Sequence, residues 1–362
     1  MMKQYGNDSF YATILDAMMD LVRVVDREGN VVLANQSLKN SFGDCVGRKC
    51  YECWGETEKC KNCVVDQAKF ESGGACATAE RTFHGRHYSV NATPLNDKDG
   101  KLMGTVEVFR DITDMVRIRE RLLKINGKMM QDISMARRLQ RSMMEKDMPN
   151  VPGYVFYDGF YPCEAIGGDA YDCILLNDGR ILLYVADVSG HGVRAAMLTI
   201  FLMQEIQLLS RLENVSVAYL LRDLDRAFQA VGAEESAYIT IFMAIIDSKT
   251  GRMDWCNAGH SVAPILKTSE GVQELYMSGL PVSRWFDAPE REVRQTVLAP
   301  GDRILFYTDG ILSVHSLQQS EQELKESFAS DHYEAKEFIA KMRRRHMKNV
   351  HDDFAMLICE RL

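Results

Sequence analysis

The stretch ADVSGHGVRAA, residues 186–196, lies between the apolar runs RILLYV and MLTIFLMQEI. Its Gly190-x-Gly192-x-x-Ala195 spacing is one that dinucleotide-binding proteins use to bring the backbone close to a pyrophosphate. Asp187 opposes this interpretation, because a carboxylate beside a pyrophosphate is repelled unless a cation lies between them. A dinucleotide site also needs an acidic residue at the end of a second parallel strand, and the nearest candidate, Glu213, lies in a helical stretch. The glycine turn therefore favours a metal site.

Aspartates at the ends of other apolar runs support the metal hypothesis. Each of them ends or interrupts an apolar run, where a charge is costly to place: Asp169 in IGGDAYD, Asp187, Asp309 in FYTDGI, and Asp352 and Asp353 in HDDFAML. Carboxylate oxygens beside glycines suit Mg²⁺ or Mn²⁺, and no spacing of histidines and cysteines in these motifs fits zinc. The pattern predicts one shared cation site.

Length and charge exclude some classes of protein. The chain has 362 residues, 46% of them hydrophobic, which is enough for about two folded domains. A formal net charge of −8 disfavours nucleic acid as a partner. The opening MMKQYGNDSFYATILDAMMD lacks the features of a secretory signal, and no window reaches the roughly 18 apolar residues of a membrane span. We therefore expect a cytoplasmic protein that does not enter a membrane.

The first third of the chain has the pattern of antiparallel hairpins. Two β-branched runs flank the polar turn DREGN, residues 26–30, and RTFHGRHYSVNATPL and KLMGTVEVFRDIT repeat the strand, turn, strand pattern. The phrases VVDREGNVVLAN, VGRKC and GTVEVFRDIT follow the order typical of the PAS sensory family, which this region resembles. The resemblance implies an α+β sensor or dimerisation domain, which we place at residues 1–113.

Residues 114–148 are predicted to form a helical linker. Five apolar residues follow heptad spacing: Met115, Ile118, Leu122, Ile125 and Met129. These residues form an apolar seam along one side of the helix, and a four-residue step from Met129 to Ile133 then shifts the seam around the helix. We expect the helix to join a sensor to an output domain and, with the PAS domain, to form a homodimer. A helix packed on one domain remains the alternative.

Beyond residue 149, strands return around two long helical segments, near residues 193–229 and 321–347. Hairpins at NDGR and SKTGR predict antiparallel sheets with helices outside, rather than a doubly wound parallel sheet. The motifs PCEAIGGDAYD, VADVSGHG, WCNAGH, LAPGDRILFYTDGI and HDDFAMLI, in this order, resemble the PPM-type metal-dependent protein phosphatases of the SpoIIE/RsbU-like branch. The resemblance implies an αββα sandwich over residues 149–362, with a dinuclear site between its sheets.

The resemblance also implies a role for each aspartate. Asp187 would bridge two Mn²⁺ or Mg²⁺ ions, and the carbonyl of Val188 would bind one of them together with Asp169. Asp309 and Asp352 would hold the other ion. Two such ions lower the pKa of a shared water, which attacks phosphorus directly. The implied substrate is phosphoserine or phosphothreonine on a bacterial regulatory protein, of the anti-sigma-factor-antagonist type.

Four further residues have open roles. Asp353 is the alternative to Asp352 as a ligand, and Asp172 has either a water-mediated role near the ions or a role at a strand edge. His191 and His260 are candidate proton donors to the leaving serine, because imidazole titrates near neutrality. The alternative for both histidines is structural hydrogen bonding in their glycine turns.

Two departures from the family pattern bear on activity. Ala355 replaces the usual threonine after the last aspartates, and the usual GLPLG loop reads GLPVSRW. Neither removes an expected metal ligand, so an active phosphatase is the first hypothesis. The second is a pseudophosphatase, in which the same fold serves as a regulatory binding module. A nucleotide-binding oxidoreductase ranks last.

A cysteine cluster lies within the PAS-like region. The segment CYECWGETEKCKNC has C-x2-C-x6-C-x2-C spacing at Cys50, Cys53, Cys60 and Cys63. Paired C-x2-C suits tetrahedral metal binding, although the central spacing is shorter than in a zinc ribbon. Three alternatives remain: reduced structural thiols, a zinc or iron–sulfur site, and a reversible disulfide sensor.

Overall fold

The computed structural model describes residues 7–70, 76–144, 146–163, 165–312, 317–330, 332–347 and 352–362. The chain divides into two compact units, Met1–Lys128 and Met129–Leu362. The division falls within α4, a helix of 32 residues over Thr113–Met144. Within the described ranges, no helix combines the length and the apolar character needed to cross a bilayer.

The first unit is built on a five-stranded antiparallel sheet in the order β2-β1-β5-β4-β3. Its strands are β1 (Leu21–Asp26), β2 (Val31–Ala34), β3 (Ala77–Phe83), β4 (Arg86–Asn96) and β5 (Leu102–Asp111). Its helices are α1 (Asn7–Asp16), α2 (Gln36–Phe42), the short η1 (Glu52–Trp54) and α3 (Val64–Phe70).

The predicted hairpins of this unit are confirmed. β1 pairs with β2 across the turn in which the Asp26 side chain accepts a hydrogen bond from the Asn30 amide at 2.7 Å. β4 pairs with β3 across Gly85 and with β5 across the turn after Asn96. Gly29 and Gly85 have φ of 87° and 75°, which glycine adopts without strain. Local turn chemistry therefore sets the hairpins of this sheet, whereas the pairing of β1 with β5 joins segments far apart in the chain.

The second unit contains two antiparallel sheets, in the orders β14-β10-β9-β8-β7, with β13 beside β9, and β12-β11-β15-β16-β6. The first has β7 (Ala170–Leu175), β8 (Ile181–Val188), β9 (Tyr238–Ile246), β10 (Arg252–Ala258), β13 (Val282–Ser283) and β14 (Arg294–Val297). The second has β6 (Tyr154–Tyr161), β11 (Ile265–Thr268), β12 (Gly271–Glu274), β15 (Arg303–Tyr307) and β16 (Phe354–Arg361).

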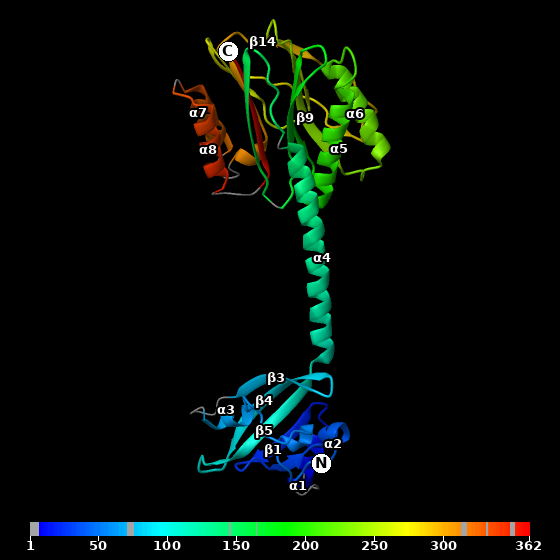
Figure 1. Ribbon diagram of the computed structural model, residues 1–362, viewed down its shortest axis with the longest axis vertical. Helices are drawn as coiled ribbons and strands as arrows, with labels where there is room; N and C mark the ends of the chain where they lie inside the picture. Colours follow the sequence, from blue (N-terminus) through cyan, green and yellow to red (C-terminus); the bar gives the residue numbers. More distant parts are fainter. Residues whose placement is uncertain are drawn as a thin grey trace. The chain divides into compact units, whose positions relative to one another are not determined.

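Helices cover the outer faces of both sheets. Figure 1 shows α5 (Val193–Leu209) and α6 (Val217–Val231) on one side, and α7 (Leu317–Ala329) and α8 (Ala335–His346) on the other. Between the sheets, Phe242 of β9 meets Phe306 of β15 with ring centroids 5.8 Å apart. The predicted αββα sandwich is confirmed, and antiparallel pairing excludes a doubly wound sheet.

Each of the two long helical segments is broken into two helices. Between α5 and α6 the chain turns through Asn214, whose φ is 56°, and Ser216 then caps α6 by accepting a hydrogen bond from the Tyr219 amide at 3.2 Å. Apolar spacing continues across the turn, so periodicity alone does not show the break. The extra turns let both helices of each pair lie against the same sheet.

Helix α4 has two apolar seams. The heptad residues from Met115 to Met129 are more than half exposed. After the four-residue step, Ile133 and Ala136 are half-buried, and Gln140 and Met144 are buried in the second unit. The shift in register therefore separates an exposed seam from one that packs on the sandwich.

Candidate metal centre

Asp187 is the penultimate residue of β8, a strand buried along most of its length. β7 and β9 both pair with β8 antiparallel, so the parallel βαβ unit of a dinucleotide-binding fold does not form here. Gly190 and Gly192 follow with φ of 91° and 77°. These backbone conformations favour glycine, and they turn the chain into α5 while Asp187 stays at the strand end.

Gly168 brings a second segment against the end of β8. A Cβ atom at Gly168 would lie 2.9 Å from the carbonyl oxygen of Val188, and the Val188 amide donates to the Gly168 carbonyl at 3.3 Å. The next residue, Asp169, is buried, and its Oδ2 accepts a hydrogen bond from Thr308 Oγ1 at 2.6 Å. The close backbone approach therefore places Asp169 beside the end of β8.

The last three aspartates come from two further segments. Asp309 begins the short helix η2 (Asp309–Ile311), and its Oδ2 accepts from Ser261 Oγ at 3.2 Å. Asp352 is exposed and precedes β16, whereas Asp353 is buried. Gly310 lets the start of η2 approach the backbone of Asp353 closely, because a Cβ atom at residue 310 would lie 1.8 Å from the Asp353 carbonyl oxygen. The ends of β8, β15 and β16 thus meet at one site.

The carboxylates at this site repel one another. Burial, and then the charge of Asp187, raises the pKa of Asp169 well above its ordinary value, although the Thr308 hydrogen bond opposes the rise. Burial, followed by the charges of Asp309, Asp352 and Asp353, raises the pKa of Asp187 to about 7. The largest charge effects on Asp169 and Asp187 all come from other aspartates. The site therefore favours a proton or a cation that neutralises these carboxylates.

This donor set fits divalent cations. The carboxylates of Asp169, Asp187, Asp309 and Asp352 are hard oxygen ligands, and the Val188 carbonyl lies beside them at the end of β8. Buried carboxylates that repel one another are stabilised when a cation neutralises them. The chemistry suits Mg²⁺ or Mn²⁺ better than a soft metal.

Asp353 is held differently from Asp352. Its Oδ1 accepts from the Cys163 amide at 2.8 Å, and its Oδ2 accepts from the Gly168 amide at 2.5 Å. Asp352 Oδ1 accepts a hydrogen bond from the amide of Asp353, the next residue, at 2.8 Å. Cys163, Asp352 and Asp353 each bring one potential ligand atom within 4.8 Å of the others. Asp353 nevertheless fastens the segment before Asp169, which leaves Asp352 as the better ligand candidate.

The comparisons with known proteins agree with this geometry. A family model described as Stage II sporulation protein E (SpoIIE) matches residues 177–362, slightly more than half of the chain. The chain belongs to the SpoIIE family. A model of the PAS fold matches residues 15–117, so this SpoIIE-family protein also carries a PAS fold. Both predicted resemblances are confirmed.

Individual relatives match parts of the SpoIIE-family chain. Phosphoserine phosphatase RsbP of Bacillus subtilis is 28% identical over 195 residues, which cover 52% of this chain and 46% of RsbP. The RsbU and RsbW domains of Rv1364c from Mycobacterium tuberculosis are 28% identical, with a TM-score of 0.52 over 60% of this chain and 63% of that one. The SiaA-PP2C domain of Pseudomonas aeruginosa shares the fold, with 18% identity and a TM-score of 0.53 over 66% of this chain and 98% of that domain. The chain thus spans about half of its curated relative RsbP.

Asp172 and the two candidate histidines lie in other surroundings. Asp172 Oδ2 is 3.4 Å from Lys146 Nζ, and Oδ1 accepts from the Cys173 amide at 2.9 Å. His260 is buried, with Nε2 2.9 Å from the Tyr307 carbonyl and Nδ1 3.3 Å from Thr240 Oγ1. Both ring nitrogens of His260 therefore contact protein atoms, whereas His191 is exposed in the glycine turn.

Several supporting residues were not predicted from the sequence. Thr308 also joins the last strand to the site, because its Oγ1 accepts from the Ala355 amide at 2.9 Å. The Gln140 side chain makes two hydrogen bonds to Gly167, at 2.6 and 3.1 Å. Thr308 precedes Asp309 in FYTDG, which is the one signal that could have identified it. Ala355 contacts Thr308 through its backbone amide and carbonyl alone. An alanine in place of the family's threonine therefore keeps these contacts.

The cysteines of the PAS fold are free thiols in the described ranges. Burial raises the pKa of Cys50 to about 11 and that of Cys53 to about 12, which keeps both thiols protonated. Among described residues, Cys50, Cys53, Cys60 and Cys63 are not gathered as a group of three metal ligands within 4.8 Å. The three alternatives, reduced structural thiols, a zinc or iron–sulfur site and a disulfide sensor, all stay predictions.

The metal-free protein should lose stability as pH rises. The pKa of Asp187 in the fold is about 7, against an ordinary value of 3.8, so the folded state binds more protons than the unfolded state between these values. The free energy of unfolding should therefore fall by a few kcal/mol from about pH 4 to pH 7, at up to about 1.4 kcal/mol per unit. Urea unfolding in a chelator measures this slope. Asp187→Asn should flatten it, and a rising slope that Asp187→Asn leaves unchanged would contradict the expectation.

Proposed function

We propose that this protein is a metal-dependent phosphatase that hydrolyses phosphoserine or phosphothreonine on a regulatory protein. The observation that carries the proposal is that buried Asp169 and half-buried Asp187, which repel each other, meet Asp309 and Asp352 in a SpoIIE-family domain. The name of the relative RsbP, a phosphoserine phosphatase, supports the reaction class. An acidic site of this kind accepts a phosphate only after cations have reversed its charge.

Each residue has a defined part in this proposal. The carboxylates of Asp187, Asp169, Asp309 and Asp352, together with the Val188 carbonyl, would hold two divalent cations, with Asp187 as the shared ligand. When bound, the cations lower the pKa of a water and neutralise the phosphoryl oxygens. Thr308 fixes the carboxylate of Asp169, and Ser261 does the same for Asp309. These hydrogen bonds orient the ligands before substrate arrives.

Of the two histidine candidates for a proton donor, we propose His191, because the surroundings of His260 suit a different role. The ring nitrogens of His260 face Thr240 and the Tyr307 carbonyl, and burial lowers the pKa of His260, so the neutral ring is favoured. Thr240 Oγ1 lies 3.2 Å from the Asp187 carbonyl oxygen and 3.3 Å from His260 Nδ1. His260 therefore supports the strand end that carries Asp187, and we assign it a positioning role.

Metal titration distinguishes an enzyme from a pseudophosphatase. Calorimetry with Mn²⁺ should show two bound ions per chain, and the same protein should release phosphate from a phosphoserine peptide only when Mn²⁺ or Mg²⁺ is present. Weak binding of ions, with no release of phosphate, would favour a regulatory binding module instead. Ala355 does not support that alternative, because its backbone makes the contacts with Thr308.

We also propose that the PAS fold receives a signal that controls the phosphatase, and that the substrate is of the anti-sigma-factor-antagonist type. A PAS fold and a SpoIIE-family domain on one chain support regulation. The continuous helix α4 provides the covalent connection between the two compact units.

The exposed seam of α4 is the proposed dimer contact. Its heptad apolar residues would pack against a second copy, together with the PAS folds. Leu122→Asp should weaken dimerisation at least about tenfold, because the substitution buries a charge in the seam. Leu123→Asp is the matched control, since Leu123 is 63% exposed and lies off the seam. Sedimentation equilibrium measures the dimer dissociation constant of both variants. Equal dissociation constants would refute the proposal that the exposed seam of α4 is the dimer contact.

A further inference from the structure

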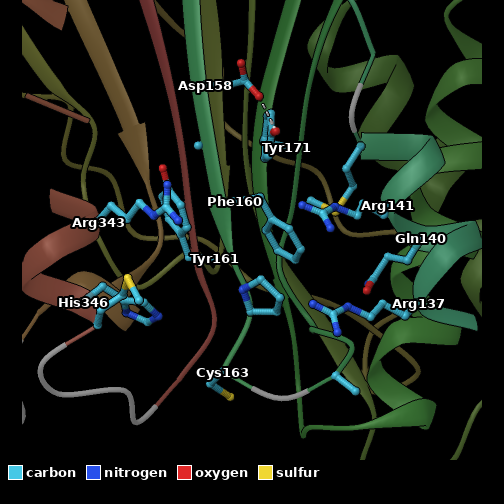
Figure 2. A pocket seen from close by; sticks show the side chains of 15 residues that line it. Arg137, Gln140, Arg141, Asp158, Phe160, Tyr161, Cys163, Tyr171, Arg343 and His346 are labelled. Atoms are coloured by element: carbon cyan, nitrogen blue, oxygen red, sulfur yellow. Dashed lines mark hydrogen bonds between the residues drawn. The ribbon is translucent and has the colours of Figure 1, made fainter. Parts of the chain in front are cut away.

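A cavity of about 630 Å³ lies within the second unit, between the end of α4 and α8. Figure 2 shows Arg137 and Arg141 of α4 on one side, Arg343 of α8 on the other, and Phe160 of β6 between them. The cavity also reaches the candidate metal centre, because the lining residue Cys163 donates its amide to Asp353. The cavity therefore borders the segment that carries Asp353 and its neighbour Asp352, a candidate metal ligand.

The walls of the cavity carry excess positive charge. Arg137, Arg141 and Arg343 are exposed residues, and the Arg343 guanidinium lies 5.5 Å from the ring centroid of Tyr161. Among the described lining residues, Asp158 is the one carboxylate, and it accepts a hydrogen bond from the Tyr171 hydroxyl at 2.5 Å. Guanidinium groups on two facing helices attract carboxylates between them.

His346 adds a buried polar atom to the same cavity. The residue is 3% exposed, and its Nδ1 lies 3.2 Å from the Gly310 carbonyl. Its Nε2 is buried and has no hydrogen-bond partner in the part of the chain that the structure describes. A nitrogen whose ring partner donates to a carbonyl can accept a hydrogen bond, for example from a peptide N–H. Most buried polar atoms in proteins have a hydrogen-bond partner, so Nε2 is an acceptor that a ligand could use.

The end of α4 that carries Arg137 and Arg141 is fixed to the rest of the second unit. Gln140 lies between Arg137 and Arg141 along the helix, and its two hydrogen bonds to Gly167 fasten this end of α4 to the segment before Asp169. The cavity and the metal centre therefore share one backbone segment.

We propose that this cavity binds an acidic peptide segment flanking the phosphorylated residue of the protein substrate. The inference rests on the proposed function, and it adds the sequence preference of the enzyme. The arginines pair with aspartate or glutamate side chains, His346 accepts a backbone N–H, and Phe160 provides an apolar wall. The volume exceeds that of a lone phosphate, and a chain of net charge −8 is poorly suited to nucleic acid.

Binding is tested without catalysis. The probe is a fluorescent, unphosphorylated peptide of glutamates around one serine, added to the full chain in a chelator and followed by anisotropy. The double variant Arg137→Gln/Arg343→Gln should weaken binding about tenfold at low salt, and the difference should shrink as salt is raised. Arg138→Gln/Arg344→Gln is the matched control, because these exposed arginines are the chain neighbours of the first pair and do not line the cavity. Equal weakening in both double variants, or no binding by the wild type, overturns the proposal.

Catalysis provides the second measurement. With Mn²⁺, the wild type should have a KM about tenfold lower for a phosphoserine peptide with glutamate flanks than for one with alanine flanks, and the cavity variant should lose this preference. Its kcat on p-nitrophenyl phosphate, which has no flanks, should stay unchanged. Hydrolysis of the small ester without a preference among peptides overturns the cavity proposal and leaves the phosphatase intact. Peptide binding without hydrolysis of either substrate refutes the phosphatase and supports the cavity.

Discussion

The Asp187→Asn variant should hydrolyse a phosphoserine peptide on the order of 10³-fold more slowly than the wild type at saturating Mn²⁺. Asp187 lies at the end of β8, where Asp309, Asp352 and Asp353 raise its pKa, and it is the residue proposed to bridge both cations. An amide supplies no negative charge, so one change weakens both cation positions and removes several kcal/mol of transition-state stabilisation. Phosphate release at a range of Mn²⁺ concentrations measures the loss.

Two other aspartates serve as controls for this result. Asp254 of β10 pairs with Arg252 at 3.2 Å, and Asp172 pairs with Lys146 at 3.4 Å. Asp254→Asn should leave the rate unchanged, and Asp172→Asn should change it less than about tenfold, as expected of a group outside the ligand set. Full activity of Asp187→Asn would refute the metal centre. A loss in Asp172→Asn equal to that in Asp187→Asn would place Asp172 among the ligands.

The Asp353→Ala variant should lose about 3 kcal/mol of stability in the absence of metal. The carboxylate of Asp353 is buried and accepts hydrogen bonds from the amides of Cys163 and Gly168. Removing it leaves two amides without an acceptor, and each unsatisfied buried donor costs about 1–3 kcal/mol. In thermal unfolding, this corresponds to a lowering of Tm by about 6–12 °C for a unit of this size.

Asp352→Ala provides the matched comparison. Asp352 is exposed, and its charge raises the pKa of Asp169 and Asp187, so its removal should leave the metal-free protein at least as stable as the wild type. Its affinity for Mn²⁺ should nevertheless fall at least about tenfold. If Asp352→Ala destabilises the metal-free protein and Asp353→Ala does not, then the assignment of the two neighbours is reversed.

The hairpins and the family could be predicted because their signals are local. The turn from Asp26 to Asn30 is set by a side chain that bonds an amide four residues away, and glycines mark the positions where φ is positive. The order of the aspartate motifs along the chain indicated a shared site, because a charge after an apolar run needs a partner. The break at Asn214 was not predicted, since apolar spacing continues through it.

The sequence by itself determined the antiparallel sheets, the PAS and SpoIIE resemblances, and the set of aspartates proposed as metal ligands. Only the tertiary structure decided how neighbouring residues divide their roles. Asp352 and Asp353 are adjacent and chemically identical, yet only Asp353 receives the amides of Cys163 and Gly168, which lie 190 and 185 residues away. The cavity likewise exists because the fold brings Arg137 and Arg343, which are far apart in the sequence, to the walls of one cavity. Turns and strand periodicity follow from near neighbours, whereas burial, hydrogen-bond partners and electrostatic repulsion follow from contacts between distant segments.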